Sequence, residues 1–337
     1  MKKRLILLAK ILIVLAVAVW VGWELYKSWD KASQLNWKPD ILWLTLSGIF
    51  YIIGYAPAAV FWRYAMVSLG QKPNWYETFR AYYIGHLGKY IPGKAMVVIM
   101  RSGMLDPART RMSVAAAAVF LETLTMMASG AFLAAVILVV WFRSIPYGNY
   151  LTILALGAML VSGLPVFPPV FRILAKKLGV GKNDPDIDEK LAGLKWTTLL
   201  TGWLLMLPAW TFLGLGLWAT VRGIGIDPGT LSETLPRFTL AATLSIVLGF
   251  VAMIPAGAGV REFAAAQILV AFFAELLIRN DPGMPVQDAQ QLAALQAILV
   301  AAVQRGVSIL AELFVSLLFA NRRSPFRWQH QIQQPPV

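Results

Sequence analysis

Residues 85–94, GHLGKYIPGK, combine positive charge with glycine and proline, and such a segment could bind an anion. Lys89, Lys94 and the nearby Arg101 would present positive charge near a membrane surface, where phosphate head groups lie. Gly88 and Gly93 permit tight turns and close backbone approach. Unpaired amides cannot face lipid, so we expect a re-entrant or interfacial hairpin that is buried in protein or lines a wet cavity. Its candidate head-group-binding residues are Lys89, Tyr90, Pro92, Gly93, Lys94 and Arg101.

A second broken segment, IPAGAGVREF, covers residues 254–263 and interrupts a long apolar stretch. Its proline and glycines predict a break, and the next helix is expected to start near Arg261. A helix N-terminus offers free amides and a favourable dipole to an anion. One broken apolar element in each half of a chain points to a transporter binding site, although two structural breaks at helix ends are the alternative. The candidate residues here are Gly257, Gly259, Arg261 and Glu262.

Ionisable side chains within apolar runs are the third feature that could do chemistry. Glu122, Arg305 and Glu312 lie in such runs, where a charge costs at least about 2.5–3.5 kcal/mol on insertion scales. Arg305, Ser308 and Glu312 share one face of a predicted helix, and we expect Glu122 to be the partner of Arg305. These residues form either a structural ion pair or a polar path for a head group or a proton. His86 is expected to be a hydrogen-bonding structural residue rather than a proton carrier.

The elements that position these residues must be membrane helices. The 337 residues are 58% hydrophobic and 14% charged, which excludes a soluble enzyme and a disordered chain. The absence of cysteine excludes a thiol nucleophile and a cysteine metal site, and the presence of only two histidines argues against a histidine metal centre, so neither a metal nor a cofactor is expected. The net charge of +13 is attributed to cytoplasmic loops and anionic lipid rather than to nucleic acid.

Apolar runs predict an all-α polytopic membrane protein with eight transmembrane helices, because a crossing takes roughly 20 residues. The first run is interpreted as a retained anchor rather than a signal peptide, and the seventh is short for a crossing. The predicted spans are residues 5–23, 41–62, 114–142, 150–170, 196–221, 238–254, 263–278 and 292–320.

The distribution of Lys and Arg predicts that both termini are cytoplasmic. With the N-terminus inside, most Lys and Arg residues fall in cytoplasmic segments, as the positive-inside rule requires. The domain prediction is one helical transmembrane domain over residues 1–320, followed by a polar cytoplasmic tail over 321–337. We expect a multi-pass protein of the plasma membrane.

Both broken segments resemble the signatures of a known family. GKYIPGKAMVVIMRSGML resembles the glycine–lysine–tyrosine–proline–glycine–lysine motif of the lysylphosphatidylglycerol synthase transmembrane region, a flippase-like family. IPAGAGVREFAAAQILV is similar to the family's second signature. The family often has Arg after the Glu of a middle span, whereas Thr123 follows Glu122 here, and Arg305 matches the Arg of the last span.

This resemblance, over roughly residues 5–320, implies a membrane domain that handles lipids. Bifunctional members add a cytosolic aminoacyl-transferase domain, which residues 1–337 lack, so we expect no such enzyme activity. The predicted function is to bind, and to flip between leaflets, an anionic or polyprenyl-phosphate lipid or lipid-linked substrate. The alternatives are a membrane enzyme or accessory subunit that serves a lipid-phosphate-dependent glycosyltransferase, and a non-transporting docking protein.

Overall fold

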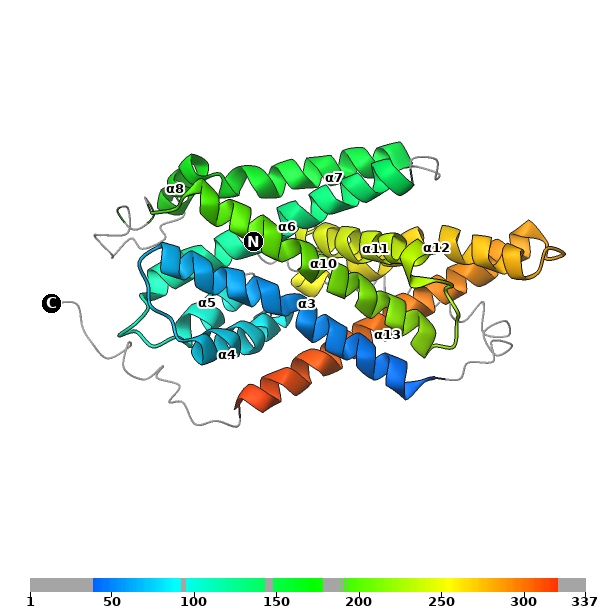
Figure 1. Cartoon of the computed structure of the whole chain (residues 1–337), viewed down its shortest axis with the longest axis horizontal. Coiled ribbons are helices and arrows are strands. Elements are labelled where there is room, and N and C mark those ends of the chain that lie inside the picture. The colour runs from blue at the N-terminus through cyan, green and yellow to red at the C-terminus, as the bar shows by residue number, and fades with distance from the viewer. Residues whose placement is uncertain are drawn as a thin grey trace, which may run out of the picture. The chain divides into compact units, whose positions relative to one another are not determined.

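A computed structural model describes residues 39–91, 95–142, 148–177, 189, 191 and 193–320, and these residues contain helices and no β-strand (Figure 1). The α-helices are α3 (Ile41–Ser68), α4 (Trp75–His86), α5 (Ala95–Gly103), α6 (Met112–Trp141), α7 (Gly148–Gly163), α8 (Pro168–Lys177), α10 (Trp196–Gly223), α11 (Leu231–Val251), α12 (Val260–Asn280) and α13 (Val286–Ala320). The short 3-10 helices are η1 (Leu87–Tyr90), η2 (Leu164–Val166) and η3 (Pro255–Gly257).

Six helices in the described part of the chain are long and apolar enough to cross a membrane, and each matches a predicted span. They are α3, α6, the segment Asn149–Val166 that begins in α7, α10, α11 and α13. The chain is therefore a multi-pass α-helical membrane protein. The predicted seventh span corresponds to α12, which is helical but is not one of these six. The predicted first span and the tail lie outside the described residues, so eight crossings and two cytoplasmic termini stay predictions.

The described residues form two compact units. The first unit takes residues from 39–54, 127–161 and 207–310, and the second takes residues from 55–126, 162–206 and 311–320. Helices α3, α6, α10 and α13 each contribute residues to both units. Both units fall within residues 1–320, for which the sequence predicted one domain.

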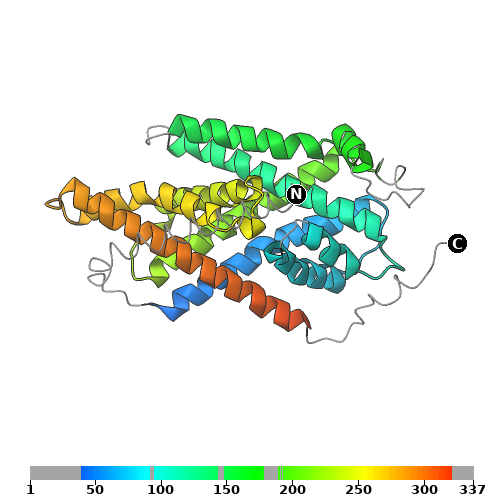
Figure 2. The same ribbon diagram turned by 180° about the vertical axis from the view of Figure 1, so that it is seen from behind.

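Small side chains bring the helices of the first unit together. In α6 and α7, Ala134, Ala135 and Ala155 are fully or almost fully buried, and Leu240 and Leu244 of α11 complete the same core. Alanine allows two membrane helices to approach closely, which increases van der Waals contact where lipid supplies no hydrophobic driving force. Helices α11 and α12 then lie side by side as a hairpin (Figures 1 and 2).

The turn between α11 and α12 confirms the break that the sequence predicted there. Gly257 and Gly259 have φ angles of 66° and 82°, which glycine adopts at little cost. Met253 and Ala256 also have positive φ, at 60° and 51°, although both carry a Cβ atom. Left-handed backbone at residues other than glycine is uncommon and persists only when the surroundings hold it. The conformation of this turn is therefore held in place by the residues around it.

In the second unit, α4, η1 and α5 form a short hairpin. Helix α4 is capped by Asn74, whose side chain accepts a hydrogen bond from the backbone N–H of Tyr76 at 2.8 Å. Helices of 12 and 9 residues are about 18 Å and about 14 Å long, so neither crosses a core of about 30 Å alone. A hairpin fits the sequence prediction, and whether it re-enters the membrane stays a prediction. Pro92, Gly93 and Lys94 lie outside the described residues.

Gly88 lies where the two arms of this hairpin approach closely. A Cβ atom at Gly88 would be 2.8 Å from the backbone N of Val97. Backbone cannot move aside as a side chain can, so the close approach predicted for Gly88 is confirmed.

Replacing Gly88 with Ala is expected to destabilise the protein by about 1–3 kcal/mol, because the added methyl overlaps backbone and forces the hairpin apart. Thermal unfolding of the detergent-purified chain, followed by tryptophan fluorescence, measures this. Gly103→Ala in α5 is the matched control, because a Cβ atom there meets nothing within 4 Å. Equal melting temperatures for the two variants would contradict the close approach.

Candidate functional site

The second unit contains a buried ion pair between α5 and α6. The Nη1 atom of Arg101 lies 2.7 Å from Oε2 of Glu122, and both side chains are at most 3% exposed. The hydroxyl of Tyr82 donates to the other carboxylate oxygen at 3.0 Å, and Thr123 donates to Oε2 at 3.2 Å. The guanidinium also lies over the Tyr82 ring, 3.8 Å from its centroid. Both charges are thus compensated inside protein.

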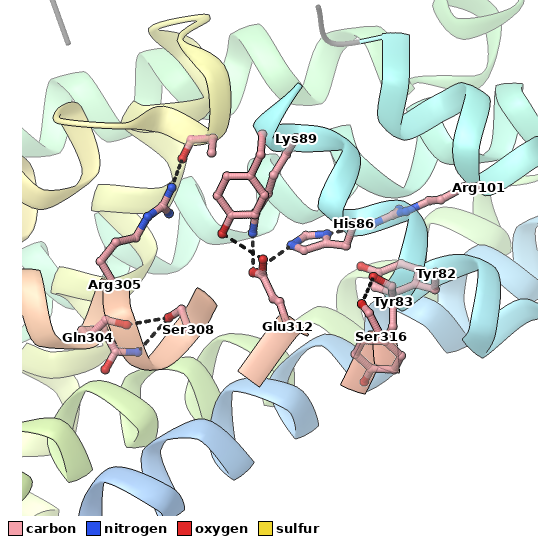
Figure 3. Close-up of polar contacts among 12 residues, drawn as sticks. Tyr82, Tyr83, His86, Lys89, Arg101, Gln304, Arg305, Ser308, Glu312 and Ser316 are labelled. Atoms are coloured by element: carbon pink, nitrogen blue, oxygen red, sulfur yellow. Dashed lines mark hydrogen bonds and ion pairs between the residues drawn. The ribbon is translucent and has the colours of Figure 1, made fainter. Parts of the chain in front are cut away.

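Three side chains of the hairpin lie around a second carboxylate of this unit, that of Glu312 in α13 (Figure 3). Lys89 forms an ion pair with Oε1, and the hydroxyl of Tyr90 donates to Oε2 at 2.9 Å. Nε2 of His86 lies 3.7 Å from Oε1, while Nδ1 of the same ring lies 3.1 Å from Nη2 of Arg101. His86 therefore stands between the two ion pairs, which supports the structural role that the sequence predicted for it.

Lys89 and Arg101 thus each pair with a carboxylate instead of standing open at a surface. Arg101 was expected to present its charge near a head group, but it is 2% exposed and neutralises Glu122. Lys89 neutralises Glu312. Phosphate binding by these residues stays a prediction.

In the first unit, a pocket brings together residues from the second broken segment and α13. Apolar residues such as Leu213, Leu217 and Ile246 form part of its wall. Its polar lining is Tyr51, Ser245, Arg261, Glu262, Gln304, Arg305 and Ser308, of which Arg261, Glu262, Arg305 and Ser308 are residues that the sequence predicted as site residues.

The aliphatic stem of Arg261, which lines this pocket, packs against the backbone of two glycines. A Cβ atom at Gly249 would lie 2.3 Å from Cγ of Arg261, and one at Gly257 would lie 2.8 Å from its Cγ and Cδ. The two glycines are themselves close, because a Cβ atom at Gly257 would also lie 2.9 Å from Cα of Gly249. The stem of Arg261 can occupy this place only because both residues lack a side chain.

Arg305 ties α13 to the turn. Its Nη2 donates to the carbonyl oxygen of Ala256 at 3.3 Å, and its Nε lies 3.4 Å from Oε1 of Glu262. The other oxygen of Glu262 accepts the backbone N–H of Gly259 at 2.6 Å, which caps the start of α12. One carboxylate thus holds both the arginine and the helix start.

The predicted pairing of Glu122 with Arg305 is wrong. Glu122 is held by Arg101 and Tyr82, and Arg305 is held by Glu262 and the Ala256 carbonyl. The expected buried face of α13 is found for Ser308 and Glu312, which are each 3% exposed.

A comparison with known protein families decides the identity of the domain. Residues 7–277 match the model of the lysylphosphatidylglycerol synthase TM region. The chain belongs to this family. No curated protein and no solved structure shows a significant match to it.

The family match includes both broken segments and all of α3 to α11, and it ends within the last turn of α12, before α13. It therefore does not reach the 5–320 range expected from the motifs. The equivalence of Arg305 to the family's last-span Arg stays a prediction, because Arg305 lies outside the match.

Three uncharged polar residues of this family member were not predicted from the sequence as site residues. Ser47, Thr220 and Gln304 form a hydrogen-bonded cluster, in which Ser47 Oγ lies 2.8 Å from Thr220 Oγ1 and 3.2 Å from Gln304 Oε1. Gln304 also lines the pocket beside Arg305. Only the position of Gln304 next to the intramembrane Arg305 could have marked it as a site residue. Single hydroxyl and amide groups are common in membrane helices and do not by themselves indicate a site.

Proposed function

We propose that this family member binds the phosphate of a lipid or lipid-linked substrate in the Arg261–Arg305 pocket and moves it between leaflets of the plasma membrane. The observation that carries the proposal is the charge of the pocket. Two arginines and one glutamate line it, so its ionisable side chains sum to one positive charge among apolar walls. In a low-dielectric setting such a charge attracts an anion strongly.

The size of the pocket supports a head-group fragment as the occupant. Its cavity of about 50 Å³ has room for roughly two waters at their volume in the liquid. A phosphate group matches this space, whereas acyl or polyprenyl chains do not and would stay in the surrounding lipid. Translocation of a head group past such a pocket, with the chains left in the bilayer, is the proposed mechanism.

The hairpin of the second unit is assigned a supporting role in the proposal. A re-entrant position would place Lys89 and Tyr90 within reach of head groups, where a phosphate could replace Glu312 as the partner of Lys89. Eight crossings with both termini in the cytoplasm complete this arrangement. While no substrate is bound, the carboxylates of the ion pairs neutralise these cations.

Transport by reconstituted protein tests the proposal. In proteoliposomes, fluorescent phosphatidylglycerol and a fluorescent polyprenyl phosphate are the two probes, and dithionite quenching reports the labelled lipid in the outer leaflet. The variants Arg261→Gln and Arg305→Gln are expected to slow flipping at least about tenfold, because each loses one charge-assisted contact to phosphate.

Arg109→Gln is the control, since Arg109 is half-exposed and pairs with Asp106 outside the pocket. Flipping at the wild-type rate by both folded pocket variants would overturn the site. If the wild-type protein flips neither probe, translocation of these lipids is excluded, and the glycosyltransferase accessory subunit becomes the leading explanation.

A further inference from the structure

The first unit has a second pocket, on the α11–α12 hairpin at the end away from the η3 turn. Glu233 and Arg237 of α11 line it together with Phe272, Glu275 and Arg279 of α12. Its cavity of about 260 Å³ is larger than the Arg261–Arg305 pocket. The two pockets have no lining residue in common.

Arg237 is the fixed cation of this pocket. Its guanidinium lies between the rings of Phe142 and Phe272, with centroid distances of 4.7 Å and 5.2 Å. Its Nη1 donates to Oε2 of Glu275 at 2.8 Å, and the Arg237 side chain is only 17% exposed. The pair links α11 to α12 and is electrically neutral.

This ion pair leaves one charge of each sign on the pocket lining. Glu233 precedes Arg237 by four residues, and Glu275 precedes Arg279 by four, so each glutamate is spaced to pair within its own helix. Arg237 and Glu275 pair with each other instead. Within the described part of the chain, Glu233 and Arg279 make no ion pair or side-chain hydrogen bond.

The neighbouring loop does not satisfy these charges. Asp227 is the nearest acidic residue of the loop before α11, and its carboxylate is taken by Arg222 at 3.0 Å and by the N–H of Gly229. Helix dipoles favour Glu233 in the first turn of α11 and Arg279 in the last turn of α12. The helix dipoles explain why Glu233 is negative and Arg279 is positive. Both side chains line the same cavity.

We propose that this pocket binds a zwitterion that carries a phosphate and an ammonium group. Arg279 holds the phosphate, Glu233 holds the ammonium, and Phe272 with Leu276 contacts the carbon chain between them. The cavity has room for roughly nine waters at their volume in the liquid, which is enough for a phosphoethanolamine unit. The occupant is either a lipid head group or the free compound, and the predicted topology places this end of the hairpin outside the cell. The inference does not depend on lipid translocation.

Native mass spectrometry of the detergent-purified full chain tests this assignment with phosphatidylethanolamine and phosphatidylglycerol as probes. Glu233→Gln is expected to weaken phosphatidylethanolamine binding about tenfold and to leave phosphatidylglycerol binding unchanged or tighter, because only the first lipid carries an ammonium. Arg279→Gln is expected to weaken both lipids, since both carry phosphate. Combining Glu233→Arg with Arg279→Glu is expected to restore binding of the zwitterion in the opposite orientation.

Glu77→Gln and Arg109→Gln are matched controls, because both residues belong to the second unit and lie outside this pocket. Thermal unfolding confirms that each variant is folded. Competition by free phosphoethanolamine supports a soluble occupant, and binding of the lipid without such competition supports a lipid occupant. Equal phosphatidylethanolamine binding by wild type, Glu233→Gln and Arg279→Gln would overturn the site. Flipping rates are a separate readout, so failure here is distinguishable from failure of the proposed function.

Discussion

Replacing Glu122 with Gln is expected to lower the free energy of unfolding by about 3–5 kcal/mol, because Arg101 then keeps a buried charge without a counter-ion. Both side chains are at most 3% exposed, so water cannot replace the carboxylate. Gln still accepts one hydrogen bond from Tyr82, which isolates the effect of charge. Equilibrium unfolding in mixed detergent micelles, followed by tryptophan fluorescence, measures the difference.

A double variant separates a structural ion pair from a general loss of packing. Arg101→Met combined with Glu122→Met removes both charges and is expected to cost less than Glu122→Gln alone, since replacing a whole buried pair by apolar groups is often neutral. Glu77→Gln, which removes a carboxylate outside this ion pair, should leave stability within about 0.5 kcal/mol of wild type. A Glu122→Gln variant as stable as wild type would show that the Arg101 charge is compensated without Glu122.

Placing a methyl group on Gly249 is expected to reduce lipid flipping at least about tenfold, although the residue bears no polar group. The new Cβ atom would lie 2.3 Å from Cγ of Arg261, near the root of that side chain, so the guanidinium must leave its place in the pocket. Displacing a positioned charge by about 1 Å can cost a hundredfold in a preorganised site. The dithionite assay in proteoliposomes measures Gly249→Ala directly.

Gly306→Ala is a close control, because Gly306 follows Arg305 directly and a Cβ atom there meets nothing within 4 Å. It should flip lipid at the wild-type rate. The double variant Gly249→Ala with Arg261→Gln should be no slower than Arg261→Gln alone, since both changes act through the same side chain. A further loss in the double variant would mean that Gly249→Ala disturbs more than Arg261.

Much of the fold follows from local sequence properties. A run of about twenty apolar residues must be helical in lipid, so the existence and approximate position of α3, α6, α10 and α13 could be predicted, although α3 and α13 are longer than the predicted spans. The break within residues 254–263 was equally predictable, because glycine and proline act locally on the backbone. Burial of Glu122, Ser308 and Glu312 followed from the cost of exposing polar groups to lipid.

The partners of the charged residues could not be predicted in the same way. Glu122 was assigned to Arg305, yet Arg101 reaches it because the α4–α5 hairpin returns α5 towards α6. Lys89 and Glu312 are 223 residues apart in sequence, and no local pattern connects them. Thr123 replaces the Arg that often follows this Glu in the family, and its hydroxyl bonds the carboxylate while Arg101 supplies the charge.

The α11–α12 end pocket was missed for a related reason. With the N-terminus inside, the predicted spans place Arg237 and Arg279 in outer segments, where such charges are ordinary in a membrane protein. Their shared cavity depends on the pairing of Arg237 with Glu275 across two helices, 38 residues apart. Sequence alone shows charges on each helix and does not show which of them remain without a partner.

The contact between Arg101 and His86 determines where the imidazole carries its hydrogen. A guanidinium can only donate, so Nδ1 of His86 must accept from Nη2 at 3.1 Å. The ring hydrogen then resides on Nε2, the nitrogen 3.7 Å from Glu312. Asparagine can reproduce the accepting Nδ1 and glutamine the donating Nε2, but neither reproduces both. His86 thus gives the hairpin a polarity, with an acceptor towards α5 and a donor towards α13, that no other neutral side chain of similar reach supplies.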